Sequence, residues 1–165
     1  MKRIFGALSI AMTLSTAGNA SAAWMFQSNE SAFDDGNTAI AATTGSVGGL
    51  GLKCQAHELS IVYLVPGTDL TQEAVETANP MHIIKLKLRI DKGDIQTLDA
   101  FAQVPQAGTL MLAAPLDKSQ ITAIRDAKSK VSIAMSMGDK NFYEQSVSAA
   151  GSSSAIGKVM SQCGL

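Results

Sequence analysis

Residues 85–91, Lys85-Leu86-Lys87-Leu88-Arg89-Ile90-Asp91, alternate apolar and charged side chains. Successive side chains of a β-strand point to opposite faces, so this period of two places Leu86, Leu88 and Ile90 on one buried face. A strand whose other face is solvated is typical of an antiparallel sheet. The stretch therefore predicts an antiparallel sheet that covers a core with one face.

A second alternating stretch, Leu50–Ala56, predicts a strand on which Cys54 faces the core. A short turn is expected at His57 and Glu58. The β-branched and aromatic run Leu59–Val65 then predicts the partner strand of a hairpin. Shorter patterns predict further strands at residues 97–102, 108–112, 131–137 and 141–148, and a surface excursion with a helical turn at residues 69–79.

Two helices are expected in the second half of the chain. The first begins at Asp117, which can cap it while Gln120 returns the bond and Leu116 packs on Ile121. The second is capped by a serine among residues 152–154 and carries apolar residues spaced i, i+3, i+4 and i+7: Ile156, Val159, Met160 and Cys163. Gly164 then supplies the left-handed residue that commonly ends a helix.

The chain contains two cysteines, Cys54 on a predicted strand and Cys163 on the predicted terminal helix. Both are expected to face the core, which predicts a disulfide between them. A reactive thiol is the alternative, but it would favour a Cys-x-x-Cys pair or a basic neighbourhood, for which Lys53 is the one hint. The predicted fold class is α+β and predominantly β: an antiparallel sheet or small sandwich with a C-terminal helix pinned by one disulfide.

The N-terminus has the organisation of a secretory signal peptide. Lys2 and Arg3 precede the apolar run 4–14, which is too short to span a bilayer, and Ala20-Ser21-Ala22 matches the small-x-small cleavage pattern. We therefore predict a signal peptide at residues 1–22 and a single β-rich domain at residues 23–165. The expected location is the periplasm or the exterior, where disulfides persist.

Charge and composition disfavour several partners. Cleavage would remove Lys2 and Arg3, which leaves 11 basic residues of 13 against 14 acidic ones and no basic cluster in the sequence. Binding to nucleic acid or to an anionic membrane draws on concentrated positive charge and is not expected. No stable membrane insertion is expected after cleavage.

The candidates for chemistry each have a simpler structural interpretation. His57 and His82 lie in predicted loops without a neighbouring nucleophile, and the serines at 152–154 lack the Gly-x-Ser-x-Gly elbow. Asp34 and Asp35 precede Gly36 and Asn37, which are ordinary turn residues rather than a calcium loop. The sequence therefore predicts no catalytic residue, no metal site and no cofactor.

Short motifs over most of the predicted mature chain resemble those of a known family. They are Trp24, Phe33–Thr38, Leu52–Cys54, Leu88–Asp91, Tyr143–Val147, Gly151–Ile156 and Cys163. With them the chain resembles the VasI/TagO-like periplasmic proteins associated with type VI secretion, and more loosely the invasion-associated locus B family. The resemblance implies a compact β-rich accessory domain with a strand-to-helix disulfide and no known chemistry.

Two functions are compatible with these observations. The first is a non-enzymatic, exported accessory protein of the cell envelope that binds a protein partner through a sheet edge or loop surface, in secretion or host association. The alternative is a small-ligand binder or hydrolase that uses His57, Asp34 or Asp35 with a serine. A deep pocket that gathers these side chains would favour the alternative.

Overall fold

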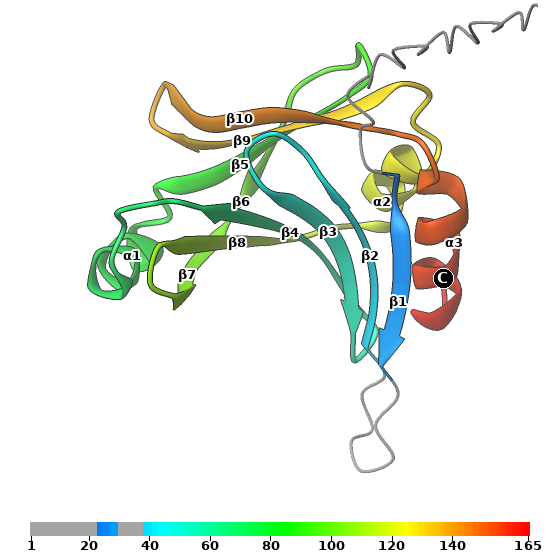
Figure 1. Cartoon of the computed structure of the whole chain (residues 1–165), viewed down its shortest axis with the longest axis horizontal. Helices are drawn as coiled ribbons and strands as arrows, with labels where there is room; N and C mark the ends of the chain where they lie inside the picture. The colour runs from blue at the N-terminus through cyan, green and yellow to red at the C-terminus, as the bar shows by residue number, and fades with distance from the viewer. Residues whose placement is uncertain (1–22, 30–37) are drawn as a thin grey trace, which may run out of the picture.

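The structure is a computed structural model that describes residues 23–29 and 38–165 (Figure 1). The predicted signal peptide, residues 1–22, and the turn residues Asp34 and Asp35 lie outside the described residues. The described part forms ten β-strands and three α-helices, which confirms the predominantly β class.

The strands form two antiparallel sheets. The six-stranded sheet has the order β1-β2-β3-β4-β8-β7 and the four-stranded sheet the order β10-β9-β5-β6. The strands of the first are β1 (Met25–Asn29), β2 (Thr38–Thr44), β3 (Gly49–Gln55), β4 (Glu58–Pro66), β7 (Phe101–Gln106) and β8 (Thr109–Pro115). Those of the second are β5 (Ile84–Ile90), β6 (Gln96–Asp99), β9 (Lys130–Met137) and β10 (Lys140–Ser148).

One apolar core lies between the two sheets and under the last two helices. Leu86 and Leu88 of β5, Ile133 of β9 and Ile61 of β4 are all buried in it, as the alternation predicted for β5. The strands of the six-stranded sheet bend, so that the four-stranded sheet lies over one end of them and the C-terminal helix along the other (Figure 1). The four-stranded sheet and the C-terminal helix therefore both lie on the convex face of the six-stranded sheet.

Three helices connect or close the sheets. Helix α1 (Gln72–Ala78) forms the predicted surface excursion, and a 3-10 turn (Asn79–Met81) follows it. Helix α2 (Lys118–Arg125) has the predicted capping box, in which the Asp117 carboxylate accepts from the Gln120 backbone and the Gln120 side chain accepts from the Asp117 backbone. Helix α3 (Ser152–Gln162) contacts β1, β2 and β3.

The prediction of a serine cap for α3 is wrong. Gly151, at φ 81°, is the N-cap and makes no side-chain capping bond. The Ser152 and Ser153 hydroxyls instead donate to the carbonyl of Arg125, at 2.9 and 3.0 Å, and so tie the start of α3 to the end of α2. The predicted apolar stripe is buried, and Gly164 has the expected left-handed backbone, at φ 78°.

Two local predictions along the strands need correction. The β3–β4 turn is made by Ala56 and His57, both with positive φ of 50° and 67°, rather than by His57 and Glu58. The single strand expected at residues 97–102 is two strands, since β6 pairs with β5 in one sheet and β7 pairs with β8 in the other. Ala100 lies between them, where the chain crosses from sheet to sheet.

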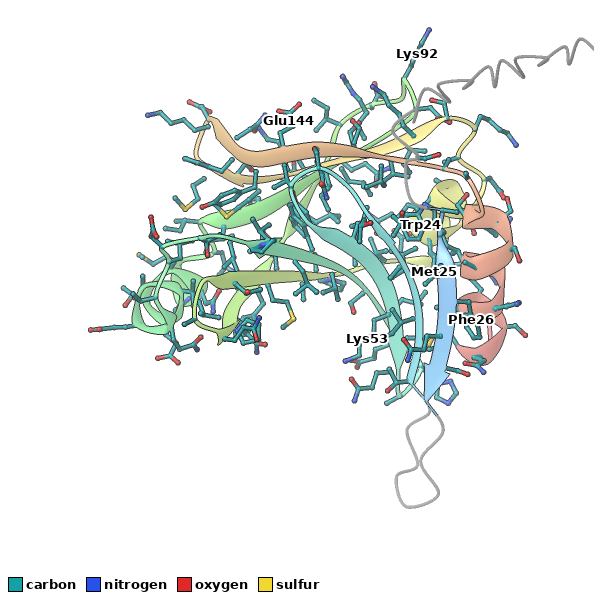
Figure 2. All side chains as sticks on the ribbon, in the orientation of Figure 1. Trp24, Met25, Phe26, Lys53, Lys92 and Glu144 are labelled. Atoms are coloured by element: carbon teal, nitrogen blue, oxygen red, sulfur yellow. A yellow bond between two sulfur atoms is a disulfide. The ribbon has the colours of Figure 1, made fainter. Side chains whose placement is uncertain are left out.

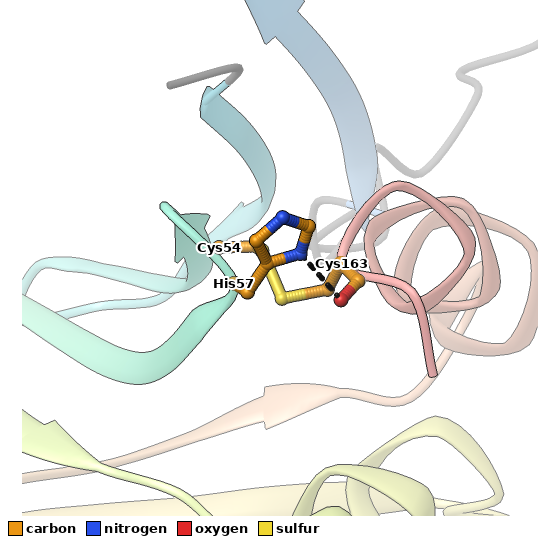
Figure 3. The surroundings of a disulfide bond; sticks show 3 residues. All are labelled: Cys54, His57 and Cys163. Carbon is orange, nitrogen blue, oxygen red and sulfur yellow. Dashed lines mark hydrogen bonds between the residues drawn. A yellow bond between two sulfur atoms is a disulfide. The ribbon is translucent and has the colours of Figure 1, made fainter. Parts of the chain in front are cut away.

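A disulfide joins Cys54 of β3 to Cys163 at the end of α3, with their Cα atoms 5.8 Å apart (Figure 3). Both cysteines are buried. At the other end of α3, Trp24 lies buried beside the helix start, where its indole Nε1–H donates to the Ser148 carbonyl at 2.9 Å. Two connections of different kinds therefore fasten the two ends of α3 to the sheets.

Candidate functional site

The structure places His57 and the serines of α3, two of the groups considered for hydrolysis, apart from each other. The exposed ring of His57 lies beside the disulfide, where its Nδ1 donates to the Cys163 carbonyl at 3.2 Å (Figure 3). Ser152 and Ser153 lie at the opposite end of α3, about 11 residues away, which is roughly 16 Å along a helix. Asp34 and Asp35 lie outside the described residues, so their relation to His57 is untested.

His82 and the glycine-rich run at residues 45–51 have local structural roles. His82 is exposed and ends the 3-10 turn with a left-handed backbone, at φ 51°. The glycine-rich run before β3 turns the chain against the buried side chain of Gln145, whose Oε1 accepts from the backbone of Val47 and Gly48 at 2.9 and 3.1 Å. The protein's own Gln145 side chain therefore occupies the space beside this run.

The outer faces of the two sheets differ in chemistry. On β5, the outward residues are Lys85, Lys87 and Arg89, as expected of a face in water. The outward residues of the six-stranded sheet are mainly small or apolar. One row of paired residues crosses all six strands of this sheet: Met25, Ala42, Gly51, Val62, Ala113 and Phe101.

We call this outer surface the apolar face and define it by that row and its neighbours on the same side, Ile40, Lys53, Ser60, Leu64 and Met111. Met25 is 70% exposed, Phe101 53% and Leu64 40%. None of the described elements covers this face (Figure 1). Contiguous exposed apolar surface is typical of interaction sites, because burying it is favourable.

The apolar face is hollowed into a groove of about 580 Å³. Its floor consists of small residues, Ala42, Gly51 and Ala113, while larger side chains such as Ile40, Leu64 and Met111 stand beside it. A Cβ added at Gly51 would lie 3.6 Å or more from its neighbours, in ordinary van der Waals contact, so the floor can accept a larger side chain without a clash. The groove therefore results from small residues paired across the middle of a bent sheet.

Lys53 is the one charged side chain among the described residues that line the groove. It projects from β3 to the side opposite α3 (Figure 2), which also places it on the other face of the strand from Cys54. Lys53 makes no ion pair with any residue that the structure describes. The neighbouring Cys54 is in a disulfide, so Lys53 has no thiol to activate there.

The outer face of the four-stranded sheet carries a shallower polar hollow of about 420 Å³. It brings Lys87, Arg89 and Lys92, from one stretch of the chain, together with Lys130 of β9, and Asp91 and Glu144 lie among them. The prediction of no basic cluster is therefore wrong for this face, because Lys87 and Arg89 share the outward side of β5 and the neighbouring β9 adds Lys130. Asp91 accepts backbone N–H bonds from residues 128–130, which hold the pKa of its carboxyl far below the usual range.

The apolar face was not predicted, although the sequence contains a signal for it. In residues 58–66 and 109–115 the outward positions include Val62, Leu64, Met111 and Ala113, so apolar residues occupy both faces of β4 and β8. In an antiparallel sheet with a solvated face, those positions are expected to be polar.

None of the described helices is long and apolar enough to cross a membrane.

The fold and this surface define a disulfide-closed, two-sheet β protein with an uncovered apolar sheet face. No family model matches the chain, and no curated protein matches it. Among solved structures, the chain is similar to the crystal structure of invasion associated protein B from Bartonella henselae, with a TM-score of 0.57 and 15% identity. The similarity covers 88% of this chain and 96% of that chain.

At 15% identity, this likeness shows a shared fold and nothing finer. It supports the looser part of the sequence resemblance, the part that concerns invasion-associated locus B. The resemblance to VasI/TagO-like proteins stays a prediction. A disulfide and this fold are together consistent with a location outside the cytoplasm.

Proposed function

We propose that this chain is an exported, non-catalytic interaction protein of the cell envelope, in the periplasm or secreted, and that it binds a protein partner through the apolar face. The observation that carries the proposal is the row of small and apolar residues on a solvent-facing sheet surface. Exposure of such a surface to water is unfavourable in an isolated protein, and its burial under a partner is favourable.

A role in host association is the finer form of the proposal. It is supported by the likeness to a protein described as invasion associated, by the predicted signal peptide and by the disulfide. The alternative hydrolase draws no support from the site, because His57 and the serines of α3 lie at opposite ends of that helix.

Site-specific photocrosslinking tests the proposal in cells that export the protein. A benzophenone side chain is placed at Leu64 in one variant and at Ile95 in another, which is 54% exposed but lies beside the four-stranded sheet. We expect a covalent protein adduct from position 64 and little from position 95. Equal yields at both positions, or no adduct at position 64, would contradict the assignment of the surface.

A further inference from the structure

The chemistry of the apolar face also indicates what kind of partner covers it. This inference rests on the proposed function and specifies it further. We infer that the groove binds an amphipathic α-helix of the partner protein, with the apolar side of the helix on the groove floor and an acidic residue of its flank beside Lys53.

The shape of the groove favours a rod-like occupant. Residues of five neighbouring strands, β1, β2, β3, β4 and β8, line it, and a spacing of about 4.8 Å between strands gives the groove a length of roughly 19 Å. An α-helix of about 13 residues has this length, with a rise of about 1.5 Å per residue. Binding of a helix in an apolar groove is a common mode of recognition between proteins.

A second copy of this chain fits the same surface less well. A symmetric dimer would place the same face of both copies together. Two hollowed faces in contact would meet at their rims and leave a space between their floors of Ala42, Gly51 and Ala113. A convex body fills that space.

A lipid chain also fits less well, because the groove is open. Small-molecule sites typically bury about 70–90% of the ligand surface. Here Met25 and Leu64 beside the groove are themselves 70% and 40% exposed, so an acyl chain on the floor would keep much of its length in water. An amphipathic helix needs only one buried side, and its polar side can remain in solvent.

Charge adds the last requirement. Lys53 lies beside the floor, two residues from Gly51 on β3, and has no carboxylate partner among residues 23–29 and 38–165. A bound helix would reduce its exposure to water, which is unfavourable unless an opposite charge approaches it. The helix should therefore carry Glu or Asp at the edge of its apolar stripe.

Fluorescence anisotropy with designed peptides tests this inference on the oxidised protein. Two labelled helical peptides of about 18 residues share a leucine stripe at i, i+3, i+4 and i+7 and differ only in flanking Glu or Lys. A third peptide has the composition of the Glu peptide in scrambled order. We expect the Glu peptide to bind about tenfold more tightly than the Lys peptide, and the scrambled peptide not to bind.

Variants of the protein locate the effect. Gly51→Leu fills the groove floor, where an added Cβ meets no atom closer than 3.6 Å, and should weaken the Glu peptide about tenfold or more. Ser146→Leu adds the same side chain to the exposed face of β10 and should leave the affinity unchanged. Lys53→Glu should reverse the preference between the two peptides. An unchanged melting temperature in each variant shows that the fold is intact.

Three results would overturn the inference. The first is equal affinity for the Glu, Lys and scrambled peptides. The second is displacement of the labelled Glu peptide by palmitate at a lower concentration than by unlabelled Glu peptide. The third is a dimer in sedimentation equilibrium that Gly51→Leu dissociates. A lack of binding by every peptide, with a crosslink at position 64, would refute the helix and retain the interaction surface. Loss of the crosslink as well would refute the proposed function itself.

Discussion

At the scale of single residues, Gln145 connects the two sheets. It belongs to β10 of the four-stranded sheet, and its buried side chain binds the β2–β3 loop of the other sheet through Val47 and Gly48. Its Nε2 also donates to the Gly48 carbonyl at 3.1 Å. A Cβ at Gly45 would lie only 2.4 Å from Gln145 Oε1, so glycine there leaves room for these bonds.

This arrangement predicts energetic coupling between Gln145 and Gly45. Gln145→Ala should cost about 1–3 kcal/mol of unfolding free energy, because it leaves loop N–H groups without acceptors. Gly45→Ala should be costly in the native protein and nearly neutral in the Gln145→Ala background, since both changes break the same bonds. Urea unfolding of the four proteins measures the coupling. Additive losses would show that the loop is held by other contacts.

Asp91 predicts a dependence of stability on acidic pH. Three backbone N–H groups hold its pKa below the usual value, so the stabilisation is present above pH 4 and is lost as the pH falls below it. Asp91→Asn keeps the shape and tolerates the left-handed backbone, at φ 51°. The variant should lose stability at pH 7 and show a smaller further loss between pH 5 and 3. Parallel urea midpoints for variant and native protein over that range would contradict this role.

Tyr63 predicts the opposite behaviour at alkaline pH. Burial raises its pKa from the usual 10.0 to about 12, while its hydroxyl donates to the Tyr143 carbonyl at the β10 bulge. Between these values the unfolded chain loses the proton and the folded chain keeps it, so the free energy of unfolding falls as the pH rises. Tyr63→Phe should cost about 1 kcal/mol at pH 7 and remove this part of the alkaline decline. Tyr143→Phe is the matched control and should retain the alkaline decline.

At the scale of elements, the accuracy of sequence prediction followed the contrast between the faces of each strand. β5 has charged and apolar faces, and its alternation was confirmed at Leu86 and Leu88, which are buried, while Ile90 at the strand end is half-buried. β2 was not predicted, because Ala42 and Ile40 of its outer face are as apolar as the inner Ala39 and Ala41. The apolar outer face that conceals such a strand from sequence analysis is also the candidate interaction surface.

The strand expected at residues 97–102 shows a different limit. β6 and β7 are separated by Ala100 alone, and their partners, β5 and β8, belong to different sheets. Local propensity contains no information on a strand's partner, because pairing depends on contacts distant in sequence. The capping box of α2 was predicted correctly for the opposite reason, since all its bonds lie within Asp117–Gln120.

The two faces of β4 give a test at the same scale. Ile61 is fully buried and Val62, its neighbour, lies on the apolar face. Ile61→Thr should cost about 2–4 kcal/mol through the lost packing and the buried hydroxyl, whereas Val62→Thr should stay within about 0.5 kcal/mol. Chemical denaturation compares them. A large loss for Val62→Thr would show that this face is covered within the protein itself.

At the scale of the whole molecule, the fold is closed by long-range connections between its first and last segments. The backbone N–H of Trp24 donates to the Ala150 carbonyl, and the Trp24 indole reaches Ser148, 124 residues away. The disulfide links β3 to the last turn of the chain. Helix α3 is thus held against the six-stranded sheet on the face opposite the groove, and the groove depends on a sheet that α3 helps to keep in shape.

The disulfide predicts how much of this closure is covalent. Its cysteines are 109 residues apart, and a loop of about 100 residues corresponds to roughly 4.7 kcal/mol in the chain-entropy description. The double variant Cys54→Ala, Cys163→Ala should therefore unfold at a much lower urea concentration, and hydrogen exchange should accelerate in α3 before β5 and β9. His57→Ala, which removes only the bond to the Cys163 carbonyl, is the control and should change stability by about 1 kcal/mol or less. Native protein treated with a reductant should behave as the double variant does. Equal urea midpoints for the oxidised protein and the double variant would show that apolar packing alone holds α3 on the sheet.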